Sequence, residues 1–247
     1  MGLTNQNCGS LAFKPTLMTA GRQANQKVIA LAGNPNTGKS TVFNALTGLR
    51  QHTGNWPGKT VTNAQGHFIH NGQKFLLVDL PGTYSLLANS ADEEVARDFL
   101  CFGQPDATIV VTDATCLERN LNLTLQVLEI TDRVVVCVNL IDEAQRKGIH
   151  VDCHKLALEL GVPVIPTAAR EGIGLDDLLD LVHDLANQRI NTTPYCVKYD
   201  PEVEDAIALL EPRLKDIFGN DLNARWVALR LLDGDQSIIS LLTETLN

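Results

Sequence analysis

The stretch GNPNTGKS, residues 33–40, matches the pattern G-x-x-x-x-G-K-[ST], which is typical of a loop that wraps phosphate groups. It follows the apolar run KVIALAG and precedes the helical pattern KSTVFNALTG. Gly33 and Gly38 let the backbone turn tightly, so that successive N–H groups point at phosphate oxygens. The start of the next helix also favours an anion. These residues predict a phosphate-binding loop between a strand and a helix.

Two side chains of this loop have predicted roles. Lys39 reaches the β- and γ-phosphates, and Ser40 places its hydroxyl on Mg²⁺. We expect the whole loop to contact the nucleotide, namely Gly33, Asn34, Pro35, Asn36, Thr37, Gly38, Lys39, Ser40 and Thr41.

A second motif, DLPG at residues 79–82, ends another apolar run. Alone this motif indicates only a turn, but after a phosphate-binding loop it predicts a site for Mg²⁺ and the γ-phosphate. Asp79 then holds Mg²⁺ through water, and the Gly82 N–H contacts the γ-phosphate. Leu80 and Pro81 line the same site.

The base is indicated by NLID, residues 139–142, after the apolar run RVVVCV. Asp142 can accept hydrogen bonds from the N1–H and 2-amino groups of guanine. Adenine has no such donor pair, and a buried carboxylate beside it would stay unpaired. Asn139 is expected to brace the loop and contact the base, with Leu140 beside it.

The next strand-end segment, TAAR at residues 167–170, is expected to bring backbone N–H groups to guanine O6. Ala169 is the chief donor and Ala168 its neighbour. Together with the order of the other motifs, this predicts GTP as the nucleotide.

Short apolar runs alternate with helical patterns, which predicts an α/β fold with a mostly parallel, doubly wound sheet, the P-loop GTPase fold. Two of its strands flank a turn at Asn71-Gly72, and residues 50–63 read as a loop. After about residue 190 only helical patterns follow. We therefore expect a flexible extension (1–26), a G domain (27–190) and a small helical domain (191–247).

The composition is that of a soluble globular chain, with 44% hydrophobic and 20% charged residues. The net charge of −9 argues against nucleic acid as a partner. The six cysteines form no C-x-x-C pair, which favours a reduced cytosolic chain. No apolar run approaches the roughly 18 residues of a membrane span.

Further stretches are more specific. GNWPGKTVT (54–62), DLPGTYSL (79–86), DATCLERNLNLTLQVLE (113–129) and RWVALRLLDGD (225–235) closely resemble the N-terminal G-protein portion of the bacterial ferrous iron transporter B family. The resemblance runs from about residue 27 to the end of the chain.

The resemblance implies further roles. Thr60 matches the switch I threonine that ligates Mg²⁺ when the γ-phosphate is present, and Gly58 and Lys59 stand beside it. Asn36 matches the asparagine that helps to hold K⁺ beside the phosphates. Lys39, Asn36, Thr60 and Gly82 are thus the candidate catalytic residues.

The resemblance also implies a membrane-spanning portion of the same transporter, absent here, that moves Fe²⁺ inward. This chain would then be the part on the cytoplasmic side of the bacterial inner membrane. A homo-oligomer is compatible with the sequence.

Two departures from familiar patterns lead to expectations. Thr83 stands where Ras-like GTPases place a glutamine that orients water, and it is too short for that role, so we expect slow hydrolysis. Ala168 replaces a frequent serine, which we expect to weaken base contacts and to speed GDP release.

Several other residues suggest metal binding only weakly. His150, Cys153 and His154 are spaced as on a helix, but such side chains are more often solvated or packed. His67 and His70 lie three apart in a strand and so face opposite sides.

Trp56 in GNWPG fits two interpretations about equally, a contact for the membrane portion or a packing residue. Asp92, Glu93 and Glu94 look like an acidic helix start, and contact with Fe²⁺ is the weaker alternative.

Two rival functions remain at this point. One is a GTPase acting on ribosomes or tRNA, which the acidic charge disfavours. The other is a nucleotide-sensing module with negligible turnover, which Thr83 keeps open.

Overall fold

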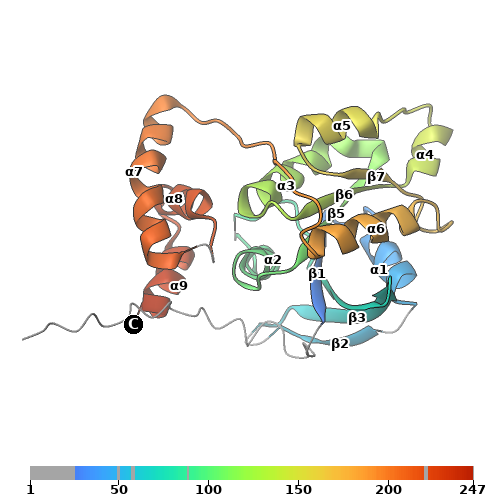
Figure 1. The fold of residues 1–247 in the computed structure, drawn as a ribbon, viewed down its shortest axis with the longest axis horizontal. Helices are drawn as coiled ribbons and strands as arrows, with labels where there is room; N and C mark the ends of the chain where they lie inside the picture. The colour runs from blue at the N-terminus through green and yellow to red at the C-terminus, as the bar shows by residue number, and fades with distance from the viewer. Residues whose placement is uncertain (1–25, 49–50, 57–58, 88, 220–221, 247) are drawn as a thin grey trace, which may run out of the picture. The chain divides into compact units, whose positions relative to one another are not determined.

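The computed structural model describes residues 26–48, 51–56, 59–87, 89–219 and 222–246. They form two compact units, one ending at Val197 and one beginning at Lys198 (Figure 1). Of the expected extension at residues 1–26, only Gln26 is described. It is buried in the first unit and shares a 2.8 Å hydrogen bond with His67. The two units are described separately below.

The first unit is one sheet with helices on both faces. Its strands are β1 (Lys27–Gly33), β2 (Gln51–Asn55), β3 (Thr62–His70), β4 (Gln73–Asp79), β5 (Ala107–Asp113), β6 (Val134–Asn139) and β7 (Val164–Pro166). Its helices are α1 (Lys39–Thr47), α2 (Ala91–Phe102), the 3-10 turn η2 (Ala114–Cys116), α3 (Leu117–Ile130), α4 (Ile141–Arg146), α5 (Cys153–Leu160) and α6 (Leu175–Ala186).

The strand order is β2-β3-β4-β1-β5-β6-β7, with β4, β1, β5, β6 and β7 parallel to one another. β1 pairs with β4 on one side and β5 on the other, so the order of connections reverses there. Loops that follow the carboxyl ends of parallel strands share one edge of a sheet, and ligands of such folds bind at that reversal. The four predicted motifs all follow parallel strands of this sheet.

The core explains why the central strands read as continuous apolar runs. β1 and β5 are covered on both faces, and nearly all their residues are buried. On one face, Phe43 of α1 and Leu178 of α6 pack with strand residues such as Ile109. α2 and α3 cover the opposite face (Figure 1). This confirms the doubly wound, mostly parallel α/β fold.

The hairpin around Asn71 and Gly72 is as predicted: both residues have positive φ, 48° and 76°, and β3 and β4 pair in antiparallel fashion. The loop expected over residues 50–63 was wrong in part, because residues 51–55 form β2 against β3. Its sequence, QHTGN, lacks the β-branched run that marks a strand, and the pairing with β3 decides the conformation. Helix α4 (Ile141–Arg146), which begins within the NLID motif, was also not expected.

The second unit holds α7 (Pro201–Phe218), α8 (Ala224–Leu232) and α9 (Gln236–Leu246). The buried side chain of Trp226 on α8 belongs to its core. Both guanidinium nitrogens Nη1 and Nη2 of Arg225 lie 2.8 Å from the Glu204 carboxylate. These hydrogen bonds, with that from the Tyr199 N–H, lower the pKa of Glu204 to about 2. Across the described residues of the chain, we find no helix with the length and apolarity to cross a membrane.

Residues 191–197, which the sequence analysis placed with the helices, are hydrogen-bonded to the first unit. The Thr193 N–H donates to Gly161 O at 3.1 Å, and the Tyr195 N–H donates to Leu160 O at 2.8 Å. Gly161 has a φ of +68°, and a Cβ there would lie 1.8 Å from Thr193 O. The close approach of this segment therefore requires glycine at the end of α5.

Candidate nucleotide site

Gly38 of the phosphate-binding loop is required by its conformation and by its neighbour. Its φ is +81°, in the left-handed region that favours glycine, and a Cβ there would lie 2.3 Å from Asn139 Nδ2. Gly33, at the end of β1, is constrained by space, because a Cβ would lie 2.6 Å from Val111 O. Both glycines thus hold the loop close to the neighbouring strand ends.

Asn139 ties three of the predicted loops together. Its Nδ2 donates to Thr37 O at 3.0 Å, across to the phosphate-binding loop. Its Oδ1 accepts from Thr167 Oγ1 at 3.2 Å and from the Ala169 N–H at 3.0 Å. Asn139 is 1% exposed, so these bonds form away from water. Asn139 thus links these loops by hydrogen bonds, and its contact with the base stays a prediction.

The same geometry corrects one detail of the base loop. The Ala169 N–H, expected to be open toward guanine O6, already donates to Asn139. Ala168 and Ala169 are both buried, and Ala168 forms a bridge with Ile173 that closes the loop. Thr167, which the sequence analysis did not single out, is the side chain that connects this loop to Asn139.

At the phosphate end, Lys39 and Asp79 form an ion pair. Lys39 Nζ donates to Asp79 Oδ1 at 2.5 Å and to Leu80 O at 2.7 Å. Burial raises the pKa of the Asp79 carboxyl, and the adjacent Lys39 ammonium opposes that rise. An ammonium group and a carboxylate thus meet where α1 begins, at the end of the phosphate-binding loop.

The remaining side chains of the loop differ in exposure. Asn36 and Ser40 are exposed, and Asn36 has a φ of 67°. Thr41 is also exposed, and Pro35 is half-buried. Asn34 is 1% exposed, and its Nδ2 lacks a hydrogen-bond partner within the part of the chain that the structure describes.

The two segments expected to sense the γ-phosphate lie at the surface. Gly82 is exposed, and a Cβ there would lie 3.4 Å from Pro35, so the DLPG segment rests against the phosphate-binding loop. Thr60 is also exposed, next to Lys59, in the bend before β3. Gly58 lies outside the described residues. By contrast, Thr83 is 5% exposed.

Asp142 lies in the first turn of helix α4 and forms an ion pair with a residue that sequence reasoning missed. Arg146, four residues later, donates from Nη2 to Asp142 Oδ2 at 2.7 Å and from Nε to Asp142 O at 3.3 Å. The aspartate–arginine spacing of four residues is the signal that could have revealed this pair. Leu140, with a φ of 61°, would be 4.0 Å from a Cβ on Gly38.

The weaker metal candidates do not assemble. Within the described ranges, we find no cluster of three or more His, Cys, Asp or Glu side chains able to hold a metal ion. His67 contacts Gln26, while His70 Nε2 lies 2.7 Å from Asp180 Oδ1, so the two histidines have separate partners.

The acidic residues Asp92, Glu93 and Glu94 lie in the first turn of α2, as expected of a helix start. Ser90 caps this helix, because its side chain accepts a hydrogen bond from the Glu93 N–H.

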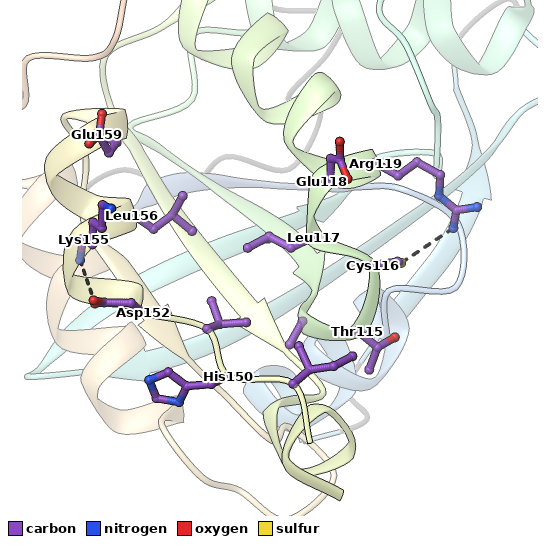
Figure 2. Close-up of a pocket in the computed structure, with 13 residues that line it drawn as sticks. Thr115, Cys116, Leu117, Glu118, Arg119, His150, Asp152, Lys155, Leu156 and Glu159 are labelled. Atoms are coloured by element: carbon purple, nitrogen blue, oxygen red, sulfur yellow. Dashed lines mark hydrogen bonds between the residues drawn. The ribbon is translucent and has the colours of Figure 1, made fainter. Parts of the chain in front are cut away.

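A separate groove of about 640 Å³ lies between the start of α3 and α5. Leu117 and Leu156 point toward one another across it, with His150 at one end and Glu118 and Glu159 at the other (Figure 2). Its lining includes the start of the DATCLERN stretch, but no residue of GNPNTGKS, DLPG, NLID or TAAR. The four motifs follow the ends of parallel strands, and this groove is separate from them.

The comparisons with known proteins agree with this geometry. Residues 27–182 match the family model described as ferrous iron transport protein B, and residues 199–247 match that of the FeoB cytosolic helical domain. The chain belongs to this family. The resemblance seen in the sequence is thus confirmed.

One curated relative, the Fe(2+) transporter FeoB of Shigella flexneri, is 40% identical over 212 residues, which are 84% of this chain and 27% of the relative. The chain thus spans about a quarter of the length of the curated relatives it matches.

Solved structures of the family are similar in fold. The cytosolic domain of the T. maritima FeoB iron transporter in a GDP form has a TM-score of 0.81 and 38% identity, covering 91% of this chain and 87% of that one. The GMPPNP form of the same domain has a TM-score of 0.79 and 39% identity, covering 87% and 86%.

Proposed function

We propose that this chain binds GTP and GDP and slowly hydrolyses GTP, as the cytosolic G-protein part of a membrane ferrous iron transporter. The observation that carries the proposal is the Asn139 tie, which links the phosphate-binding loop at Thr37 to the TAAR loop at Ala169. One nucleotide would then span from Asp142, at the base, to Lys39 and Asp79, at the phosphate end. The GDP and GMPPNP forms of the related T. maritima domain support this proposal.

The residues fit Mg²⁺ as the metal. Ser40, Thr60 and Asp79 offer two hydroxyl oxygens and a carboxylate, and hard oxygen donors are what Mg²⁺ prefers. Asp79 would act through water. Bound Mg²⁺ would neutralise charge on the phosphates. Lys39 must then leave Asp79 and turn to the β- and γ-phosphates, so nucleotide loading exchanges one ion pair for another.

Asn36 is the proposed ligand of K⁺. Its side chain is exposed at the mouth of the loop and, within the described residues, accepts and donates no hydrogen bond to other groups. An amide oxygen in that position can help to hold a monovalent cation beside the phosphates. Such a cation would supply the positive charge that an arginine finger supplies elsewhere.

Hydrolysis is expected to be slow for a structural reason. Thr83 follows Gly82, is 5% exposed, and has a side chain too short to orient the attacking water as a glutamine would. The switch segments around Thr60 and Gly82 would order on GTP binding and relax after hydrolysis. In the full transporter this change would be passed to the membrane portion that moves Fe²⁺, at the cytoplasmic side of the inner membrane. Neither nucleic acid nor a fixed oligomeric state enters the proposal.

The test is to measure GTP hydrolysis by this chain in KCl and in NaCl at equal ionic strength, with Asn36→Ala alongside. We expect turnover that K⁺ accelerates and that loses this acceleration in Asn36→Ala, while GDP affinity changes little. Equal rates in both salts would remove the role of K⁺ at Asn36. Tight GTP binding without turnover in either salt would favour the nucleotide-sensing module instead.

A further inference from the structure

The loop that carries Thr60 is fastened to helix α2 by a buried side chain. Trp56 is 3% exposed, and its ring meets Phe99 of α2 edge-on, with centroids 5.4 Å apart. Tryptophan buries more apolar surface than almost any other side chain, so withdrawing it would be costly. Of the two interpretations of Trp56, the structure shows the packing role.

Backbone hydrogen bonds join Trp56 to Val61 and to Lys59. The Trp56 N–H donates to Val61 O at 2.9 Å, and the Lys59 N–H donates to Trp56 O at 3.0 Å. Val61 is itself 9% exposed. Trp56 and Val61, which lie on either side of Lys59 and Thr60 in the sequence, are therefore both held in the interior.

A second contact on the same helix is of a different kind. Lys59 Nζ lies 2.8 Å from Glu94 Oε2, and the two side chains are 35% and 31% exposed. Asp98, one turn further along α2, is 2.7 Å from Arg97 and also feels the charge of Lys59, but the carboxylate paired with Lys59 is that of Glu94. A partly exposed ion pair is weak and opens readily, unlike a buried tryptophan.

We propose that Glu94 is a positioning residue for Thr60: its ion pair with Lys59 holds the loop on α2 until a triphosphate and Mg²⁺ draw Thr60 away, while Trp56 stays buried as the pivot. Lys59 and Thr60 are adjacent, so the ion pair between Lys59 and Glu94 restrains the backbone next to Thr60. The inference rests on the proposed function, since it assigns a regulator to that same site.

The decisive variant is Glu94→Gln in the whole chain, with GMPPNP·Mg²⁺ and GDP affinities measured by calorimetry at low ionic strength. Removing the ion pair should tighten GMPPNP binding about two- to fivefold and leave GDP binding unchanged. The gain should shrink at high salt. Glu94→Asp, which keeps the charge, should behave as the original chain.

Asp92→Asn is the matched control, because Asp92 lies in the same first turn of α2 but, among the described residues, makes no ion pair. It removes the same charge near the helix start and should leave both affinities unchanged. A Glu94→Gln protein whose GMPPNP-to-GDP ratio equals that of the original chain, or equals that of Asp92→Asn, would overturn the inference. If the original chain binds neither nucleotide, the proposed function itself fails, and the inference fails with it.

The pivot is tested separately in a Trp226→Phe background, where Trp56 is the remaining tryptophan. Its emission maximum should be blue-shifted and equal with GDP and with GMPPNP, because the ring stays against Phe99. A red shift with GMPPNP would show that Trp56 leaves α2 and would overturn the pivot.

Discussion

The base side and the switch side of the proposed site are built differently. On the base side, Asn139 is 1% exposed and joins Thr37, Thr167 and Ala169 by hydrogen bonds. On the switch side, Thr60 and Gly82 are exposed, and the Thr60 loop is held by Trp56 and the Lys59–Glu94 pair rather than by the phosphate-binding loop.

This difference separates a part that must be ready before the nucleotide arrives from a part that must change with it. Buried and mutually satisfied polar groups hold one geometry, because breaking any bond leaves an unpaired group. Exposed segments fastened by a few contacts can order and relax at low cost. Changes on the base side should therefore affect GDP and GTP alike, and changes on the switch side should affect only the triphosphate.

The largest effect is expected from Gly38→Ala. The new methyl group meets Asn139 Nδ2 and displaces it, which disrupts its three hydrogen bonds at about 1 kcal/mol or more each. We expect affinity for both GDP and GMPPNP to fall on the order of 100-fold or more, as measured by calorimetry.

Gly72→Ala is the control for Gly38→Ala. Gly72 also has a positive φ, +76°, but a Cβ there meets nothing within 4 Å. Both variants carry left-handed strain of about 1–2 kcal/mol, whereas only Gly38→Ala adds the collision. If Gly72→Ala weakens nucleotide binding as much as Gly38→Ala does, the loss of affinity does not come from the collision with Asn139.

An intermediate effect is expected from Asn139→Ala. This variant frees the Thr37 carbonyl, the Thr167 hydroxyl and the Ala169 N–H without a collision, which costs about 1–3 kcal/mol. GDP and GMPPNP affinities should both fall, by about tenfold to 100-fold.

Asn120→Ala is the matched control, because Asn120 is also fully buried and accepts a backbone hydrogen bond, from the Asp113 N–H at 2.7 Å. It should lower the melting temperature with little change in nucleotide affinity. An Asn139→Ala protein that binds GMPPNP poorly and GDP normally would place Asn139 on the switch side. The difference between the base side and the switch side would then not hold.

The smallest effect is expected from Thr60→Ala. Loss of one proposed metal ligand should weaken GMPPNP·Mg²⁺ binding by about tenfold and leave GDP affinity unchanged. Stopped-flow measurements of both nucleotides would show this as a faster GMPPNP release. Equal losses for the two nucleotides would mean that the Thr60 loop is as preformed as the base side.

Local patterns in the sequence were sufficient for most of the fold. The hairpin at Asn71-Gly72, the acidic helix start at residues 92–94 and the buried parallel strands each follow from short-range rules. β2 was missed because QHTGN has no strand pattern of its own and is a strand only because β3 pairs with it. The Arg146 contact was missed although its spacing from Asp142 is visible in the sequence.

Sequence alone determined which chemical groups the chain offers, because GNPNTGKS, DLPG and NLID name donors and acceptors suited to phosphate, Mg²⁺ and guanine. It also determined the family, which the comparisons confirm. The tertiary structure decided which of those groups are already engaged: Lys39 by Asp79, the Ala169 N–H by Asn139, and Trp56 by Phe99. Those partners lie tens of residues apart in the chain, and only the pairing of strands and the packing of helices brings them within contact distance.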